Sequence, residues 1–341
     1  PRGVMLTNGA IIANEAVIYE QAGAAGPGVG WLPPYHDMGL IGMILQPLFA
    51  GTHTVLLSPV DFLKRPVRWL RAIHAFGGEQ NAAPEFAFSL MNRRITPKEL
   101  EGLDLSSWRI CWNGAEPIRP DTIEAFEARL APFGLRPGVI RPCYGLAEGT
   151  LMATRTTATD RSFPEVRPAA LDAGRLEPGP GRRLAAVGSS PPGHTLRVVD
   201  PDTRTPVADG LIGEVWLQGP STAVGYWRRP EQTAATFGAT LADGDGPWLR
   251  TGDLGSLDPG SGQLVIAGRR KDLLIVHGRN LHPHDLEATA AAAHPRIRAG
   301  SVAAFEIDGA TRPSLGIVAE VDQRGDGVDL EPVMAAVTEA M

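Results

Sequence analysis

The sequence is poor in the residues that mark several classes of protein. It holds two cysteines, Cys111 and Cys143, and so indicates neither a disulfide framework nor a CxxC metal pair. Lysine occurs three times in 341 residues, and the formal net charge of −6 argues against a nucleic-acid-binding surface. No apolar run approaches the roughly 18–20 residues that cross a bilayer, and no signal-peptide pattern is visible. We therefore expect a cytoplasmic protein with no nucleic-acid partner and no transmembrane segment.

What is present fits a globular protein, with 43% hydrophobic and 21% charged residues. Apolar strand-like runs alternate with helical patterns over the first part of the chain. The pattern predicts strands at 54–57 and 109–112, a helix over 61–76 with Asp61 as N-cap, and a helix over 120–133. This alternation favours an α/β layered fold with a largely parallel sheet.

The alternation stops at about residues 156–183, which are rich in Pro, Gly, Arg and Ala and predict a long loop or an insertion. Short strands follow. We predict a large domain over 1–270, with parallel-type sheets, helices and a β-rich part, and a small, incomplete α+β domain over 271–341. The remaining predicted elements are strands at 196–199, 214–217, 264–266, 273–276, 301–305 and 315–321, and a helix over 284–293.

Two segments that follow strands carry residues suited to a nucleotide. Tyr144 precedes the flexible Gly145 and could stack on a base, while Glu148 could hold Mg²⁺, which shares oxygen ligands with phosphates. In the second segment, residues 113–118, small side chains would let the backbone approach a flat ligand. A strand that ends in a solvated glutamate and an ordinary strand-to-helix turn would give the same two patterns, so neither is specific alone.

Three further residues have side chains that suit ligand contacts. Asp253 lies on a turn, where one carboxylate could accept from two ribose hydroxyls, and Arg269 is a fixed cation that could bridge ribose and phosphate. His36 projects from a Pro- and Gly-containing loop whose apolar neighbours could line an acyl pocket. A hairpin aspartate, a structural histidine and ordinary core residues are the alternatives.

The order of these motifs is far more specific than any one of them. The chain resembles the adenylate-forming (AMP-binding) superfamily, which includes acyl-CoA synthetases, peptide-synthetase adenylation domains and luciferases. The motifs, in chain order, are Pro-Arg-Gly-Val, Leu-Pro-Pro-Tyr-His-Asp-Met-Gly, Asn-Gly-Ala-Glu-Pro, Tyr-Gly-Leu-Ala-Glu, Gly-Glu-Val-Trp-Leu-Gln-Gly-Pro, Tyr-Trp, Thr-Gly-Asp-Leu and Gly-Arg-Arg-Lys-Asp.

Within that superfamily the chain looks most like the fatty acyl-AMP ligases. Residues 31–42, 104–109, 113–117 and 142–148 carry this finer match, and Ala147 stands where most of the superfamily has Thr. The stretch at about 156–183 lies where this branch carries an insertion. In that branch the insertion is thought to restrain the C-terminal domain and to discourage chemistry with CoA.

The resemblance implies a role for each site residue. Gly114, Ala115 and Glu116 would edge the adenine. Tyr144, followed by Gly145, would stack on it. Glu148 would hold Mg²⁺ on the phosphates of ATP, and Asp253 and Arg269 would bind the ribose and phosphate. His36 would lie at the acyl end of the pocket, and Lys271 would be the hinge of the small domain. Glu148, His36 and Arg269 are therefore the candidate catalytic residues.

We also expect from the resemblance that the chain is truncated at both ends. The phosphate loop that precedes Pro-Lys-Gly in relatives would lie upstream of residue 1, its usual lysine is Arg2 here, and no lysine follows Lys271. These residues alone are therefore expected to form little acyl-adenylate. The resemblance implies a fatty-acid substrate and an acyl carrier protein or polyketide synthase module as acceptor. The alternatives are a long-chain acyl-CoA ligase and a non-catalytic adenylate-binding module of a multidomain synthase.

Overall fold

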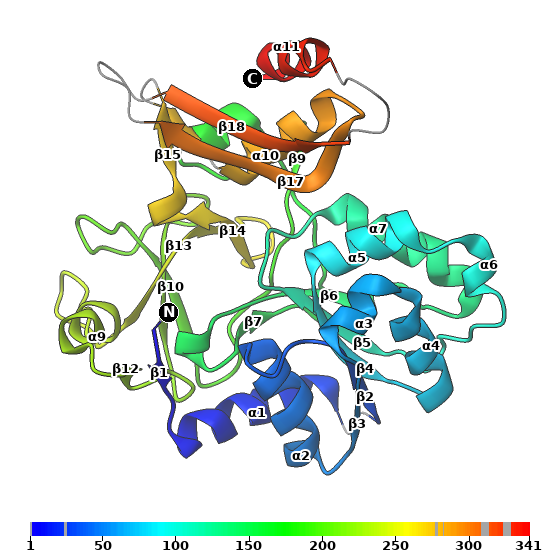
Figure 1. The fold of residues 1–341 in the computed structure, drawn as a ribbon. Helices are drawn as coiled ribbons and strands as arrows, with labels where there is room; N and C mark the ends of the chain where they lie inside the picture. Colours follow the sequence, from blue (N-terminus) through cyan, green and yellow to red (C-terminus); the bar gives the residue numbers. More distant parts are fainter. Residues whose placement is uncertain (1, 24–25, 277–278, 282, 308–313, 323–328) are drawn as a thin grey trace.

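A six-stranded sheet lies at the centre of the first half of the chain (Figure 1). The computed structural model describes residues 2–23, 26–276, 279–281, 283–307, 314–322 and 329–341. The strand order is β3-β2-β4-β5-β6-β7, and all neighbours are parallel except the antiparallel pair β6–β7. The predicted α/β fold with a largely parallel sheet is confirmed. The strands are β2 (Gly28–Gly30), β3 (Thr54–Leu56), β4 (Gln80–Pro84), β5 (Ile110–Gly114), β6 (Ile140–Gly145) and β7 (Met152–Arg155).

Helices cover this sheet and are held to it by an aromatic core. Trp69 of α4 donates its indole N–H to the carbonyl oxygen of Val29 in β2 at 2.9 Å, so a buried polar group is satisfied. Trp31 and Phe62 stack with ring centroids 3.8 Å apart. The helical segments are α1 (Asn8–Ala22), η1 (Met38–Leu45), α2 (Gln46–Ala50), α3 (Pro59–Lys64), α4 (Val67–Phe76), α5 (Glu85–Arg94), α6 (Pro97–Leu100), α7 (Pro120–Leu130) and η2 (Ala131–Phe133).

The single helix predicted over 61–76 is wrong, because the chain forms α3 and α4 with a break between them. Pro66 disfavours helical backbone in the residue before it, and Arg65 accordingly has φ −144° and ψ 85°. The N-cap is Ser58, whose hydroxyl accepts from the backbone N–H of Asp61 at 3.0 Å. The helix predicted over 120–133 likewise stops at Leu130 and continues only as the 3₁₀ turn η2.

A four-stranded antiparallel sheet, in the order β10-β11-β13-β14, forms the β-rich part of the chain. It contains the predicted strands at 196–199, 214–217 and 264–266. Beside it, β1 from the start of the chain pairs with β12, which brings the first described residues against residues 225 and 226. The elements are β1 (Val4–Met5), β10 (Thr195–Val199), β11 (Gly213–Gln218), β12 (Gly225–Tyr226), α9 (Pro230–Phe237), β13 (Leu249–Leu257) and β14 (Leu264–Arg269).

Residues 156–183 are more ordered than their composition indicates. They contain β8 (Glu165–Val166), α8 (Pro168–Asp172) and β9 (Arg182–Arg183), and β8 pairs with β9. Their apolar side chains form a small core against Val265 of β14. The segment is therefore not one long loop, and its interpretation as an insertion stays a prediction.

The last part of the chain forms two small antiparallel sheets and two helices, which lie beyond β14 (Figure 1). Within the described residues, none of the helices combines the length and the apolar content needed to span a bilayer. The domain boundary at Lys271 falls in the 3₁₀ turn that follows β14, and it stays a prediction. The elements are η4 (Arg270–Asp272), β15 (Leu274–Val276), β16 (Arg279–Leu281), α10 (Pro283–Ala293), β17 (Ile297–Ile307), β18 (Ser314–Val321) and α11 (Glu331–Ala340).

A buried carboxyl group in α1 makes the stability of the fold depend on pH. Glu15 is 2% exposed, and burial raises the pKa of its carboxyl group to about 8. The side-chain amide of Gln46 contacts it. Because the carboxyl group binds its proton more tightly in the folded chain, stability is lost as the pH rises from the unfolded pKa near 4.5 toward 8.

We expect Glu15→Gln to remove this loss, since the amide is similar in shape and does not ionise. The melting temperature of the variant relative to the parent should rise by about 3 °C or more between pH 5 and pH 9. Thermal unfolding followed by circular dichroism measures this. Glu20→Gln on the same helix is the control, and an equal pH response in both variants would contradict the assignment to Glu15.

Candidate active site

The strands β4, β5 and β6 end at one edge of the parallel sheet, which is where open α/β sheets bind ligands. Gly114 ends β5 so close to β6 that an added Cβ would lie 2.9 Å from the Cys143 carbonyl oxygen. The next residue, Ala115, has φ 66°, a left-handed conformation that costs a non-glycine residue energy. Such strain persists only where the surrounding structure fixes the backbone, and here it falls on a residue predicted to edge adenine.

A buried hydrogen bond joins the end of β6 to the antiparallel sheet. The Tyr144 hydroxyl donates to the Asp253 carboxylate at 2.6 Å, and the Arg269 Nε donates to the other carboxylate oxygen at 3.0 Å. Asp253 and Arg269 also face each other across β13 and β14. Burial raises the pKa of Asp253, and the bonds from Tyr144 and Arg269 oppose that rise. The predicted base-stacking and ribose-binding residues therefore lie in direct contact.

Glu148 follows β6 in a 3₁₀ turn and is held by a residue for which the sequence predicted no role. The Tyr226 hydroxyl donates to one Glu148 oxygen at 2.6 Å, and the Arg2 guanidinium lies 5.1 Å from the centre of the Tyr226 ring. Arg2 Nη1 is also 3.4 Å from the Tyr226 hydroxyl. The Tyr-Trp motif was the only sequence feature that pointed to Tyr226. Its contact joins residues 78 positions apart, so the spacing of residues along the sequence does not reveal it.

The surroundings of Glu148 fit a magnesium ion shared with phosphates. In the part of the chain that the structure describes, no three or more His, Cys, Asp or Glu side chains gather as a metal site. Mg²⁺ commonly needs only one or two carboxylates, because substrate phosphates and waters complete its octahedron. Tyr226 contacts one oxygen of Glu148 and leaves the second for a cation. Magnesium binding at Glu148 remains a proposal.

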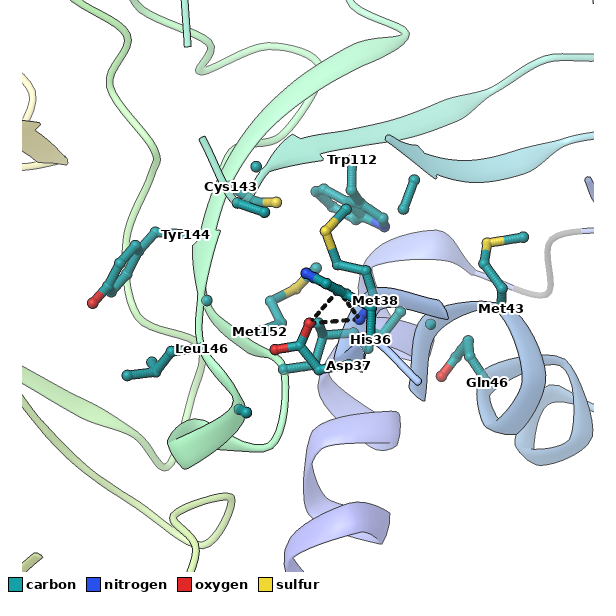
Figure 2. Close-up of a pocket in the computed structure, with 18 of the residues that line it drawn as sticks. His36, Asp37, Met38, Met43, Gln46, Trp112, Cys143, Tyr144, Leu146 and Met152 are labelled. Atoms are coloured by element: carbon teal, nitrogen blue, oxygen red, sulfur yellow. Dashed lines mark hydrogen bonds and ion pairs between the residues drawn. The ribbon is translucent and has the colours of Figure 1, made fainter. Parts of the chain in front are cut away.

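A cavity of about 230 Å³ extends from this edge beneath α1 and η1 (Figure 2). Figure 2 shows Tyr144 and Leu146 on one side of the cavity, and Met43 and Gln46 on the other. Glu148 and Arg269 also belong to the lining, together with polar side chains such as Gln80 and Asn81 and the apolar side chains of Met38, Trp112, Leu151 and Met152. We call this cavity the α1 pocket.

His36 lines the α1 pocket beside Asp37 (Figure 2), and its place at the acyl end stays a prediction. Its Nδ1 lies 2.7 Å from the Asp37 carboxylate. The hydrogen bond with Asp37 is the main cause that raises the pKa of His36, while burial opposes the rise. The loop therefore holds a cation-forming side chain at the pocket wall rather than in the core.

A second cavity of about 680 Å³ lies between the large sheets and α10. It shares Ala115, Cys143, Tyr144, Gly145 and Arg269 with the α1 pocket, so these residues form a common wall. The predicted residues Glu116, Asp253 and Lys271 line the second cavity. We call it the domain cavity.

Next to the predicted residue Glu116 lies a buried carboxyl group, that of Glu85, which was not predicted from the sequence. Burial raises the pKa of Glu85 to about 7, and Asn113 donates to its carboxylate at 3.0 Å. Glu116 accepts from the backbone N–H of Phe86 at 3.2 Å, and burial raises its pKa as well. These bonds fix the start of α5 to the turn that follows β5.

Comparisons with known proteins agree with this architecture. The model of the AMP-binding enzyme family matches residues 1–227. JamA of Moorena producens, a medium-chain-fatty-acid–[acyl-carrier-protein] ligase, is 38% identical over 100% of this chain and 59% of its own length. FadD21 of Mycobacterium tuberculosis, whose name assigns it to the fatty-acid–CoA ligases, is 41% identical over 96% of this chain and 58% of its own length.

A solved structure has the same fold. The fatty acyl-adenylate ligase of L. pneumophila, in complex with acyl adenylate and pyrophosphate, superposes with a TM-score of 0.79 at 34% identity, covering 100% of this chain and 61% of that one. The chain thus spans about three fifths of the length of these relatives. It belongs to the AMP-binding enzyme family, and within that family it is similar to fatty acyl-AMP ligases.

Tyr226→Phe tests whether the tyrosine positions Glu148 for a cation. We expect the affinity for ATP with Mg²⁺ to fall by roughly tenfold, since one hydrogen bond to a charged group contributes about 1.5 kcal/mol. Affinity for ATP without Mg²⁺ should change much less. Isothermal titration calorimetry measures both, with the exposed Tyr35→Phe as control. An equal loss with and without Mg²⁺ would show that Tyr226 acts on the nucleotide or on the fold.

Proposed function

We propose that this chain is the nucleotide- and acyl-binding core of a fatty acyl-AMP ligase. The enzyme would activate a fatty acid with ATP, release pyrophosphate, and pass the acyl group to an acyl carrier protein or a polyketide synthase module. The observation that carries this proposal is the α1 pocket, which opens beside Tyr144, Glu148 and Arg269 and continues between apolar side chains. A nucleotide site joined to an apolar pocket suits an acyl-adenylate.

The chemistry needs no side-chain nucleophile. A carboxylate oxygen of the fatty acid attacks the α-phosphorus of ATP, the bond to pyrophosphate breaks, and the acyl-adenylate remains. In this proposal Arg269 and Glu148, which line the same cavity, would face the charge that builds on the phosphates, and positioning and electrostatic stabilisation would supply the catalysis. Mg²⁺, when bound, would offset phosphate charge. In this proposal Tyr144 and residues 114–116 border the adenine, Asp253 binds the ribose, and His36 lies near the acyl carboxylate.

The contact between residues 156–183 and α10 supports a carrier rather than CoA as acceptor. Arg182 of β9 forms an ion pair with Asp285 and lies 3.1 Å from His284 Nε2. This contact ties the inserted segment to the small domain, whose swing about Lys271 would open the acceptor site. We propose that the tie disfavours the arrangement that CoA would need.

Two alternatives remain open to experiment. A long-chain acyl-CoA ligase would transfer the acyl group to CoA at a rate comparable with transfer to a carrier protein. A non-catalytic adenylate-binding module would bind adenylate but support no exchange of pyrophosphate into ATP. The contacts of Asp253 with Tyr144 and Arg269 favour a working nucleotide site over a decayed one.

Binding of a non-hydrolysable acyl-adenylate tests the proposal directly. We expect 5′-O-(dodecanoylsulfamoyl)adenosine to bind the chain at least tenfold more tightly than 5′-sulfamoyladenosine, because burial of the alkyl chain contributes about 0.8 kcal/mol per CH₂. Calorimetry measures both affinities, and Asp253→Ala should weaken both compounds alike. If the dodecanoyl group adds nothing, the α1 pocket is no acyl site.

Arg182→Ala tests the tie between the inserted segment and α10. Removing this partly exposed ion pair should weaken the contact between β9 and α10 by roughly 1 kcal/mol. The equilibrium between the closed and the open contact should then shift about fivefold toward the open one. Hydrogen exchange of the α10 amides should accelerate to that extent, and acyl transfer to CoA should rise in enzyme that carries the variant. Arg167→Ala is the control, because its ion pair with Glu177 stays within the segment. Unchanged exchange in Arg182→Ala would exclude the tie.

A further inference from the structure

A third cavity lies at the opposite edge of the parallel sheet from the candidate active site. Its volume is about 230 Å³, and it is bounded by the starts of β5 and β6 and by the last residues of α1. Strands of five or six residues separate it from the active-site edge, which is roughly 17–20 Å. Three arginines line it: Arg109, Arg136 and Arg141. We call it the arginine pocket.

The charge of these arginines is only partly balanced. Arg109 pairs with Glu79 at 3.1 Å, whereas Arg136 is exposed. Arg141 forms no ion pair with any residue that the structure describes, and its Nε donates to the Gly138 carbonyl oxygen at 3.4 Å. Burial and the nearby charge of Arg109 both lower the pKa of Arg141, and Asp160 opposes them. A bound anion would stabilise the positive charge of a half-buried guanidinium that lies beside a second guanidinium.

The number of arginines favours a phosphate group over a carboxylate. The three arginines come from the residue before β5, the loop before β6, and β6 itself. A planar carboxylate fits one guanidinium fork, while a tetrahedral phosphate has oxygens for several donors and up to two charges. The carboxyl end of α1 adds partial negative charge at Ala22, which limits the affinity for any anion.

Trp112 and helix α1 link the arginine pocket to the α1 pocket, although the two cavities share no lining residue. The Arg141 guanidinium lies 5.8 Å from the centre of the Trp112 ring, and these two residues face each other across β5 and β6. Trp112 in turn lines the α1 pocket. Helix α1 covers both cavities, with Ile18 on one and Gln21 on the other. An anion that fixes Arg141 therefore also restrains one wall of the α1 pocket.

We propose that the arginine pocket binds a small phosphate-bearing anion, either free orthophosphate or the phosphoryl group of a small molecule, and that the anion holds Arg141 against Trp112. This site is separate from the nucleotide site and does not rest on the proposed function. Occupancy of the arginine pocket would then change the shape of the α1 pocket through Trp112, with no contact between the two ligands.

The test titrates the chain with sodium phosphate, phenyl phosphate and sodium acetate, at matched ionic strength, and follows the Trp112 indole resonance by NMR. The resonance is assigned with Trp112→Phe. We expect a saturable shift with phosphate, and acetate should bind at least tenfold more weakly. Tighter binding of phenyl phosphate would identify a phosphorylated small molecule as the source, and tighter binding of phosphate the free ion. Acetate binding as tight as phosphate would overturn the proposal.

Variants separate the pocket from general electrostatics. Arg141→Met keeps the apolar stem and should weaken phosphate binding by roughly tenfold, the loss of one charge-assisted hydrogen bond. The exposed Arg136→Ala should weaken it several-fold without any effect on folding. Arg197→Ala removes an exposed arginine that lines neither pocket and should leave binding unchanged. Equal losses in all three variants would overturn the proposal.

One competition experiment distinguishes this site from the nucleotide site. Phosphate should still bind and shift the Trp112 resonance when 5′-O-(dodecanoylsulfamoyl)adenosine saturates the chain. Displacement of phosphate by that compound would place the anion in the nucleotide site and overturn the proposal. Failure of the adenosine compound to bind at all would count against the proposed function and leave the phosphate result standing.

Discussion

The buried hydrogen bond between Tyr144 and Asp253 is the contact on which the rest of the site depends. It joins the carboxyl end of the parallel sheet to the antiparallel sheet across 109 residues. Asp253 is 6% exposed, and a carboxylate at that depth is stable only with donors around it, which Tyr144 and Arg269 supply. Tyr144 lines both the α1 pocket and the domain cavity, and Asp253 lines the domain cavity, so the bond holds part of the wall that separates the two cavities.

Helix α1 fixes the other side of the same turn. The Asn14 amide donates to the Met152 carbonyl oxygen at 2.9 Å and accepts from the Met152 N–H at 3.0 Å, so a fully buried side chain replaces part of a strand ladder. Thr150, with φ 71°, donates its hydroxyl to the Ser221 carbonyl oxygen at 2.7 Å. The turn that carries Glu148 is thus bound to α1 on one side and to the β-rich part on the other. Its strained backbone is held by these contacts rather than by local preference.

Much of this architecture could be predicted from local patterns, and the limits of that prediction are physical. Apolar runs located β3 and β5 of the parallel sheet, and Pro120 marked the start of α7. The strands β2 (GVG) and β4 (QNAAP) were missed, because small and polar residues give no apolar run. Pro66 also indicated the break between α3 and α4. The helical periodicity of residues 61–76 favoured one continuous helix and so hid this break. The sequence of residues 156–183 shows no hydrophobic periodicity, because short elements such as β8 and α8 each contribute a single side chain to the small core. For the site, the resemblance placed the predicted residues, but the partners Tyr226 and Asn14 lie far away in sequence and leave no trace in spacing.

The charged side chains differ between the two edges of the parallel sheet, and helix α1 borders a cavity at each edge. At the active-site edge, Glu148 and Asp253 are held by tyrosine hydroxyls, and Arg269 supplies the positive charge. At the opposite edge, arginines predominate and Glu79 balances one of them. The α1 pocket combines apolar side chains with polar ones such as His36, Asp37 and Asn81. Trp112 contacts Arg141 and also lines the α1 pocket, and its indole face suits both neighbours. The position of this ring therefore links one wall of the α1 pocket to the Arg141 guanidinium.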